Sequence, residues 1–226
     1  MKILVLNGSP KAKSDTMRMT RSFLSGLQAQ TECDVIIIDV IKKNIKPCVG
    51  CFMCWKNGDG KCVQKDDQNE ILCEILKSDV IIWSFPLYCY SMPSHLKAVV
   101  DRLIPLCRLN MREENGRVSH ETLFDLSKKK HIVFSGSGFP NWEGNFEGLR
   151  LQMKNNFGDP LMVFVPETPL LNVPQAVVVA DPLLEKFRLA GEEFAKTCTL
   201  SQETVRLLEA PMLPKEVYLG QVNSVL

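Results

Sequence analysis

Four cysteines within fifteen residues are the side chains whose spacing most directly suggests chemistry in this sequence. Cys48, Cys51, Cys54 and Cys62 follow the pattern C-x2-C-x2-C-x7-C. Two consecutive C-x2-C steps let three thiolates converge on one centre, as in known cluster-binding runs. The turn Gly58-Asp59-Gly60 offers a way for Cys62 to return to them. The pattern suits an iron–sulfur cluster, a structural zinc ion or metal-free thiols.

The segment 8–16, GSPKAKSDT, has the residue types of an anion site. It supplies hydroxyls, lysines and the backbone N–H groups of a helix that begins within it, and such helix starts bind phosphate readily. It lacks GxGxxG and the Walker lysine pattern, so a single phosphate of a mononucleotide fits it better than a dinucleotide or ATP. The alternative is a Ser/Thr helix cap with nothing bound.

Two further segments combine aromatic, small and polar residues. They are 84–93, SFPLYCYSMP, and 135–142, SGSGFPNW. A flat heterocyclic ring needs side chains to stack on and backbone N–H groups for its carbonyl oxygens, and both segments offer them. Either segment alone could be an ordinary turn, but three suitable loops after three strands point to one ligand site.

Alternating strands and helices must bring these segments together. Apolar runs predict buried strands at 2–7, 33–40, 79–85, 131–135 and 161–165. Helical spacing predicts helices at 14–29, from Asp66 onward, 93–107, 146–157 and 181–197. Such alternation is typical of a parallel sheet covered on both faces, with right-handed crossovers. The cysteines fall in a long loop, 44–65; the stretch 107–130 reads as a polar connection, and the tail carries no periodic signal.

Composition excludes several classes of protein. The chain has 45% hydrophobic and 23% charged residues and a formal net charge of +1, so no basic excess points to nucleic acid. Nine cysteines, an odd number without a signal peptide, argue against a disulfide framework. No apolar run is long enough for a membrane span. We therefore expect a cytoplasmic protein.

The motifs LNGSPKAKSDT, SFPLYCYSMPSHLKAVVDRL and SGSGF, in this order, resemble the NAD(P)H-dependent FMN reductase and iron–sulfur flavoprotein group of the flavodoxin-like superfamily. The resemblance covers roughly residues 1–200. It implies an α/β fold, a doubly wound five-stranded parallel sheet of order 2-1-3-4-5 with helices on both faces. It also implies an FMN-binding domain over 1–200 with the cysteine-rich loop 44–65, and a C-terminal extension, 201–226, packing on the domain or on a partner subunit.

The resemblance further implies the site residues. Those for the cofactor are Ser9, Lys11, Ser14, Asp15, Thr16, Pro86, Leu87, Tyr88, Cys89, Tyr90, Ser91, Ser135, Gly136, Ser137, Gly138 and Phe139. The first loop would hold the phosphate of FMN, and the second and third would frame its ring. Cys48, Cys51, Cys54 and Cys62 would ligate a 4Fe–4S cluster if one is present. Lys97, Asp101 and Arg102 match a helix motif with a structural or interface role.

The function that these residues favour is an FMN-dependent oxidoreductase. It would pass electrons from NAD(P)H or a reduced carrier to a small-molecule or protein acceptor, and no protein acid or base is required. The alternative is an iron–sulfur flavoprotein that exchanges electrons with ferredoxin-like partners. A third possibility is a flavin-free binding module. A homodimer or homotetramer is expected from the resemblance, and no separate nicotinamide motif is visible.

Overall fold

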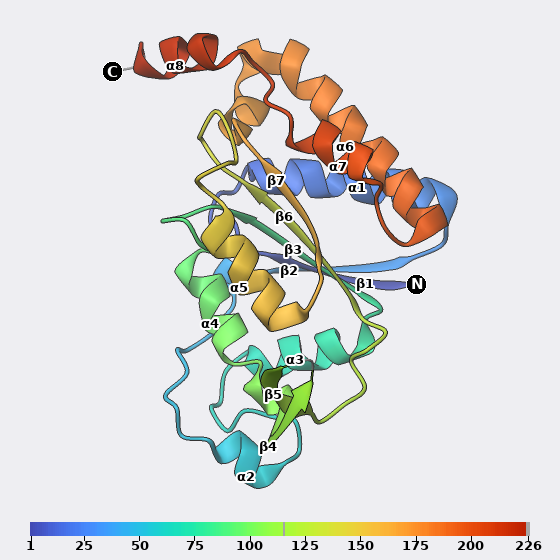
Figure 1. Cartoon of the computed structure of the whole chain (residues 1–226), viewed down its shortest axis with the longest axis vertical. Coiled ribbons are helices and arrows are strands. Elements are labelled where there is room, and N and C mark those ends of the chain that lie inside the picture. The colour runs from blue at the N-terminus through green and yellow to red at the C-terminus, as the bar shows by residue number, and fades with distance from the viewer. Residues whose placement is uncertain (115, 225–226) are drawn as a thin grey trace.

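The computed structural model describes residues 1–114 and 116–224, and its centre is one parallel sheet (Figure 1). The five strands are β1 (Lys2–Asn7), β2 (Asp34–Asp39), β3 (Val80–Pro86), β6 (Lys130–Gly136) and β7 (Leu161–Val165). They lie in the order β2-β1-β3-β6-β7, and every neighbouring pair is parallel. Numbered among themselves, these strands have the order 2-1-3-4-5, so the predicted α/β architecture with a five-stranded parallel sheet is confirmed.

Helices cover both faces of the sheet, as Figure 1 shows. One layer consists of α1 (Asp15–Gln30), α6 (Val177–Thr197) and α7 (Gln202–Glu209), and the other of α3 (Gln68–Lys77), α4 (Ser94–Asp101) and α5 (Glu147–Phe157). Short 3-10 turns occupy Val40–Lys42, Ile104–Leu106, Thr168–Asn172 and Pro174–Ala176. Each layer buries its own apolar cluster against the sheet. In the part of the chain that the structure describes, no helix is long and apolar enough to cross a membrane.

Two glycines let α1 and α6 approach at backbone distance. A Cβ atom added to Gly26 would lie 1.8 Å from the carbonyl oxygen of Arg188, and one added to Gly191 would lie 1.9 Å from that of Phe23. The Phe23 ring then packs edge-on against Phe134 of β6, with ring centroids 5.1 Å apart. This contact fixes α1 on the sheet and thereby fixes the loop that leads into it.

Five expectations about elements need correction. The stretch 107–130 is not merely a polar connection, because it forms the antiparallel hairpin of β4 (Cys107–Glu114) and β5 (Arg117–Thr122). The tail contains two helices, α7 and α8 (Lys215–Asn223), and the cysteine loop contains α2 (Met53–Asn57). Helix α4 ends at Asp101 instead of near 107, since Pro105 disfavours helical backbone before it. Helix α6 begins at Val177, one turn before the predicted start.

His131 is a half-buried histidine held between aromatic rings. Its ring stacks on Phe157 with centroids 4.3 Å apart, and its Nδ1 atom accepts a hydrogen bond of 3.1 Å from the indole Nε1 of Trp83. An accepting Nδ1 requires the neutral ring. Burial, aided by the charge of Lys129, lowers the pKa of His131 to about 4. The folded state therefore disfavours the protonated imidazole.

We expect the stability of the folded chain to fall as pH drops from 6.5 toward 4. In this window the unfolded histidine binds a proton and the folded one does not, so protons favour unfolding. The loss between pH 8 and pH 5 should be about 2 kcal/mol, since one pKa unit corresponds to about 1.4 kcal/mol. Urea unfolding of the wild type and of His131→Gln, which keeps an acceptor for Trp83, measures it. Equal pH-dependent losses in the two proteins would contradict this assignment.

Candidate functional site

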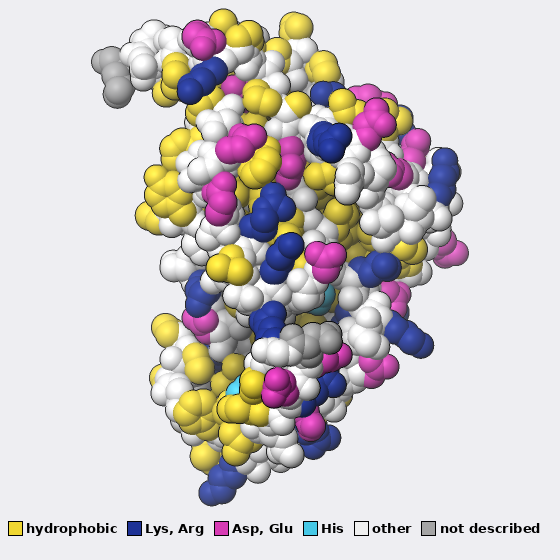
Figure 2. Space-filling view, viewed as in Figure 1, with side chains coloured by type: hydrophobic (Ala, Val, Ile, Leu, Met, Phe, Trp, Pro, Cys, Tyr) yellow, Lys and Arg dark blue, Asp and Glu magenta, His cyan; other side chains and the backbone are white. Residues whose placement is uncertain are grey.

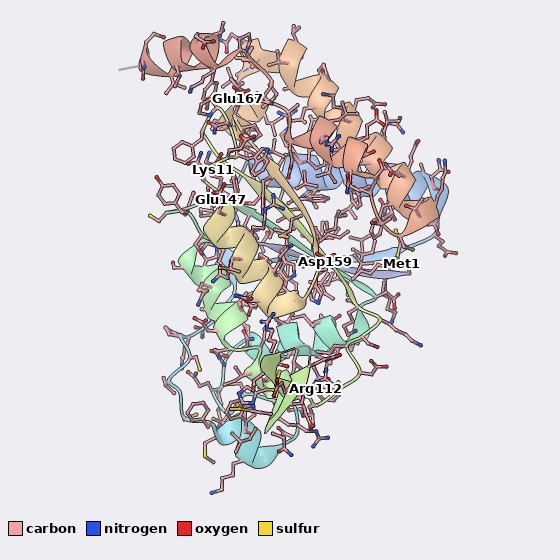
Figure 3. All side chains as sticks on the ribbon, viewed as in Figure 1. Met1, Lys11, Arg112, Glu147, Asp159 and Glu167 are labelled. Atoms are coloured by element: carbon pink, nitrogen blue, oxygen red, sulfur yellow. The ribbon has the colours of Figure 1, made fainter. Side chains whose placement is uncertain are left out.

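The three loops with the predicted ligand residues meet at the carboxyl edge of the sheet. They follow β1, β3 and β6, which are neighbours in the sheet. In Figure 3, Lys11 of the first loop and Glu167, which follows β7, lie at one edge of the sheet, whereas Met1 and Asp159 mark the opposite edge. Strand order reverses between β1 and β3, and ligands of open parallel sheets bind at such a switch point.

Hydrogen bonds with residues of β1, β2 and β3 hold the first loop in place. The backbone N–H of Gly8 donates to the carbonyl of Ser84 (2.8 Å). The amide of Asn7 donates to Asp39 (2.8 Å), and its oxygen accepts from the N–H of Ser9 (3.0 Å). These contacts place the loop between β1, β2 and β3.

Helix α1 begins directly in this loop. The Ser14 hydroxyl caps it by accepting from the N–H of Met17 (3.1 Å), and it lies 3.1 Å from the hydroxyl of Thr16. The Lys11 ammonium pairs with Asp15 (3.2 Å), which also accepts from Asn172. The hydroxyls are thus gathered at a helix N-terminus, while the nearest lysine is partly neutralised by Asp15.

The second loop is a tight turn from Tyr88 to Ser91. The two residues exchange backbone hydrogen bonds of 2.9 and 3.0 Å. Both central residues, Cys89 (φ 47°) and Tyr90 (φ 62°), have left-handed backbone, the geometry of a type I′ turn. Non-glycine residues pay roughly 1–2 kcal/mol each for this conformation. In this turn both side chains are exposed to solvent, and Tyr90 is 58% exposed.

The third loop is packed against the residues that follow β7. The N–H of Ser137 donates to Val165 (3.0 Å), and the carbonyl of Ser137 accepts from the N–H of Thr168 (2.9 Å). A Cβ on Gly136 would lie 2.4 Å from the Thr168 side chain, so this position needs glycine. The Phe139 ring lies nearly parallel to that of Tyr90, with centroids 6.1 Å apart. The second and third loops therefore share one aromatic face.

The predicted cofactor residues divide into two groups by exposure. Those of the first loop and the base of the third are buried: Ser9, Ser14, Asp15, Thr16, Ser135, Gly136 and Ser137. Those at the loop tips are exposed: Lys11, Tyr88, Cys89, Tyr90, Gly138 and Phe139; Pro86, Leu87 and Ser91 are half-buried. The first loop lines a polar pocket of about 520 Å³, and the aromatic tips line an apolar one of about 360 Å³.

Sequence reasoning missed the residues that support these loops. His95 at the start of α4 hydrogen-bonds through Nε2 to the carbonyl of Gly8 (2.9 Å). Since a carbonyl only accepts, Nε2–H is the donor; burial lowers the pKa of His95, and the bond to Gly8 opposes that shift. Thr20 joins α1 to the end of β3 through the hydroxyl of Ser84 (2.9 Å). A polar residue in the strand or helix beside a candidate loop is the only signal of this role in the sequence.

The four clustered cysteines line one pocket away from the sheet edge. Cys48, Cys51, Cys54 and Cys62 share it with Arg102, which follows α4. Cys54 is buried, Cys62 is half-buried, and Cys48 and Cys51 are exposed. Burial raises the pKa of the Cys54 thiol. The cysteine loop with α2 lies near the β4–β5 hairpin, at the end of the molecule opposite α8 (Figure 1).

The surface around this pocket is apolar and aromatic. The Phe52 ring stacks on Trp55 with centroids 5.1 Å apart, and Trp55 contacts the His120 ring of the hairpin at 4.8 Å. Apolar side chains gather over this end of the molecule in Figure 2. Exposed ones from the loop and the hairpin are Val49, Phe52, Met53, Val63, Leu109, Met111 and Val118. Of these, Val49, Phe52 and Val63 also line the cysteine pocket.

A buried ion pair closes the cysteine loop at its base. The Arg102 guanidinium bonds both carboxylate oxygens of Asp66 (2.5 and 2.9 Å) and the carbonyl of Lys46 (2.9 Å). Arg102 is 1% exposed. Burial works to raise the pKa of Asp66, but Arg102 and two backbone N–H groups hold it below its ordinary value. The two ends of the loop, at residues 46 and 66, are thus tied to the end of α4.

The thiols do not converge on a single-ion site. Over residues 1–114 and 116–224, no three His, Cys, Asp or Glu side chains are grouped closely enough to hold one metal ion. A tetrahedral zinc ion needs its sulfur ligands about 2.3 Å from one point. In the described residues the four thiols are therefore not gathered around one point.

Comparison with known proteins gives a consistent family. A model of the NADPH-dependent FMN reductase family matches residues 1–119. An iron–sulfur flavoprotein of Methanocaldococcus jannaschii is 34% identical over 106 residues, covering 47% of this chain and 53% of that protein. One of Archaeoglobus fulgidus is 30% identical over 105 residues, covering 46% of each. The chain thus matches about half the length of these curated relatives.

Solved structures share the fold over most of the chain. An NAD(P)H:quinone oxidoreductase from Methanothermobacter marburgensis superposes with a TM-score of 0.64, covering 86% of this chain and 96% of that one. Sequence identity over this superposition is 19%. At this identity the likeness concerns the fold alone.

The C-terminal segment supports the third loop through Glu167. This buried residue has left-handed backbone (φ 58°), and its N–H donates to the carbonyl of Phe139 (2.9 Å). Its carboxylate accepts from the N–H groups of Met212 and Leu213 (2.6 and 3.0 Å). Tyr218 of α8 donates to the carbonyl of Gly138 (2.8 Å). Burial raises the pKa of Glu167, although both N–H groups oppose that shift.

We expect Glu167→Ala to release the C-terminal segment. The amides of Met212 and Leu213 lose their acceptor, so their hydrogen exchange should accelerate about tenfold or more, given about 1–3 kcal/mol for a lost bond to a buried carboxylate. Hydrogen exchange followed by mass spectrometry measures this effect. Glu203→Ala, an exposed position of α7, is the matched control. Equal protection of residues 212–218 in wild type and Glu167→Ala would contradict the anchoring role.

Proposed function

Since the chain belongs to the NADPH-dependent FMN reductase family, we propose that it binds FMN across the loops after β1, β3 and β6. The observation that carries the proposal is the presence of two pockets on loops at the same sheet edge, one lined by the first loop and the other by the second and third. One is polar, lies at the N-terminus of α1 and suits a phosphate. The other is apolar, is faced by Tyr88, Tyr90 and Phe139, and suits a flat ring.

The first loop fits the phosphate end of the cofactor. Ser9, Ser14 and Thr16 are buried small hydroxyl residues at a helix start. The pocket also contains the cationic side chains of Lys13, Arg18 and Arg21 near its rim. Hydroxyl and N–H donors supply hydrogen bonds to a dianionic phosphate, and the helix dipole favours the negative charge.

The second and third loops fit the ring end. The left-handed turn holds Tyr90 outward opposite Phe139, so a flat ligand would meet aromatic surface. When bound, FMN supplies the hydride and electron chemistry; the residues of this chain bind and orient it. We propose NAD(P)H as the electron donor and a small molecule as the acceptor, in keeping with the oxidoreductases that share the fold. We name no catalytic side chain.

The remaining assignments are also proposals. We assign cofactor binding to residues 1–200, and we assign residues 201–226 as an extension that supports the third loop through Glu167 and Tyr218. Assembly as a homodimer or homotetramer stays a prediction.

We expect Thr16→Val to weaken FMN binding about tenfold. The loss of one hydroxyl bond to a charged phosphate is worth about 1.5 kcal/mol or more, and 1.4 kcal/mol is a factor of ten in Kd. Fluorescence quenching of FMN measures the Kd. Riboflavin, which lacks the phosphate, should bind the variant and the wild type alike.

Thr20→Val is the matched control for this experiment. It removes another buried hydroxyl one turn along α1, which bonds Ser84 and the carbonyl of Thr16, so it should not change the ratio of FMN to riboflavin affinity. A Thr16→Val protein that loses both ligands equally would show that Thr16 is only structural. Wild type that binds neither flavin would refute the FMN site.

A second candidate function is favoured by the cysteine pocket. We propose that Cys48, Cys51, Cys54 and Cys62 hold a 4Fe–4S cluster and that the chain exchanges single electrons with a redox carrier protein. Four thiols in an apolar pocket are a suitable donor set, and four irons spread their ligands more widely than one ion does. The pocket encloses only about 10 Å³, so the exposed Cys48 and Cys51 must move outward to admit a cluster.

We expect protein purified without oxygen to contain about four irons and four acid-labile sulfides per chain, with a broad absorption shoulder beside the flavin peaks. Cys62→Ser should lower the iron content, whereas Cys73→Ser, an exposed cysteine of α3, should not. Flavin peaks without iron in the wild type would reject the cluster and leave the NAD(P)H oxidoreductase. Full iron content in Cys62→Ser would reject Cys62 as a ligand.

A further inference from the structure

Arg102 has more donors than its ion pair uses. Its Nη1 and Nη2 atoms bond Asp66 and the carbonyl of Lys46. Its Nε is buried and, among the described residues, has no hydrogen-bond partner. A buried donor left unpaired costs roughly 1–3 kcal/mol, and an unpaired group on a charged side chain calls for an explanation.

The guanidinium lies against the cysteine pocket. Arg102 lines it together with Cys48, Cys51, Cys54 and Cys62. Burial works to lower the pKa of Arg102, but the bonded Asp66 and then the nearby Cys62 raise it. Cys62 is itself fixed from the other side, because its N–H donates to Asn69 (2.8 Å) and its carbonyl accepts from the Asn69 amide (2.9 Å). Cys62 therefore shares its pocket with a fixed, buried cation.

We propose that Arg102, which lines the cysteine pocket with an unpaired buried Nε donor, is a positioning residue whose positive charge beside Cys62 stabilises an anionic iron–sulfur cluster. This inference rests on the cluster proposed above. Hydrogen bonds to cluster sulfurs and nearby charge are among the factors that set cluster potentials. A cation stabilises the more negative, reduced state, so Arg102 raises the midpoint potential. It also holds Cys62 in place as the fourth ligand.

A purely structural role for Arg102 makes a different prediction. Arg102 ties Lys46 to Asp66, so removing either member of the ion pair would loosen the same loop. If Arg102 only ties the two ends of the loop together, Arg102→Gln and Asp66→Asn should impair the cluster alike. They should also shift its midpoint potential in the same direction. The proposed role predicts opposite directions, since one variant removes a positive charge beside Cys62 and the other removes a negative charge behind it.

The test compares four proteins reconstituted anaerobically with iron and sulfide: wild type, Arg102→Gln, Asp66→Asn and Arg108→Gln. The last is a matched control, an exposed arginine of β4. Measurements are iron and sulfide per chain, the rate of iron loss to a chelator, and the midpoint potential of the loaded fraction. Flavin content and thermal unfolding report on the fold.

We expect Arg102→Gln to bind the cluster about 10- to 100-fold less tightly, as is typical for loss of a group that supports metal ligands. Its midpoint potential should move to more negative values, that of Asp66→Asn to more positive values, and that of Arg108→Gln should match the wild type. If Arg102→Gln does not fold, Arg102→Lys, which keeps the charge and loses the Nε donor, should retain the potential better than it retains the iron.

Two results would overturn the inference. The first is a midpoint potential of Arg102→Gln that equals that of the wild type. Where Arg102→Lys replaces it, the equivalent result is a wild-type midpoint potential together with unchanged iron retention. The second is a shift of both ion-pair variants in the same direction. Wild type that takes up no iron and sulfide would overturn the cluster, and this inference with it, whereas cluster-bearing wild type with unaffected Arg102 variants would overturn the inference alone.

Discussion

A parallel sheet sends the carboxyl ends of all its strands to one edge, and the candidate flavin site depends on this polarity. β1 lies between β2 and β3, and the chain winds in opposite directions from it. The loops after β1 and β3 therefore part from each other and leave room between them. The close packing of α1 on α6 through Gly26 and Gly191 then fixes where the first loop begins. The parallel direction of the strands brings residues 9 and 139 to the same edge of the sheet.

The cysteine pocket depends on a different interaction, the buried pair of Arg102 and Asp66. Breaking such a pair by removing one partner costs about 3–5 kcal/mol, because the other charge stays buried. Gln68 reinforces the same junction: its Nε2 donates to the carbonyls of Val99 and Arg102 (3.1 and 2.9 Å). Helix α4 therefore serves both sites, since His95 at its start holds Gly8 and Arg102 after its end holds the cysteine loop.

Much of the fold could be predicted from the sequence, because buried parallel strands are continuous apolar runs. The strand predicted at 79–85 and the observed β3 differ by one residue at each end. The β4–β5 hairpin could not be predicted in this way, since β4 is no continuous apolar run and seven of its eight residues are exposed. Only Cys107, Leu109 and Met111 alternate with polar residues, a signal too short to stand out in a polar stretch. Helices α7 and α8 are short, and Pro211 and Pro214 lie between them, so no long periodic pattern marks the tail.

The sequence could predict which loops form the candidate site, but it could predict the geometry of those loops only in part. The hydroxyls of the first loop follow from a strand ending at Gly8 and a helix capped by Ser14. The left-handed turn at Cys89 and Tyr90 was not predictable, because neither residue is a glycine or asparagine and tertiary contacts impose the conformation. Arg102 was placed in a structural motif, but its partners Asp66 and Cys62 lie 36 and 40 positions earlier, a separation that no local pattern encodes.

The four cysteines are not equally prepared for the proposed cluster, and this difference bears on what the charge of Arg102 would do. Cys54 is buried and Cys62 is fixed by Asn69 and shares its pocket with Arg102, whereas Cys48 and Cys51 are exposed on the loop. Half of the ligand set is therefore in place before loading, and the other half must be ordered by it. Part of the binding free energy then goes into closing the loop. The fixed charge of Arg102 beside Cys62 would reduce the binding free energy needed to close the loop, because it stabilises negatively charged sulfur at the cysteines that are already ordered.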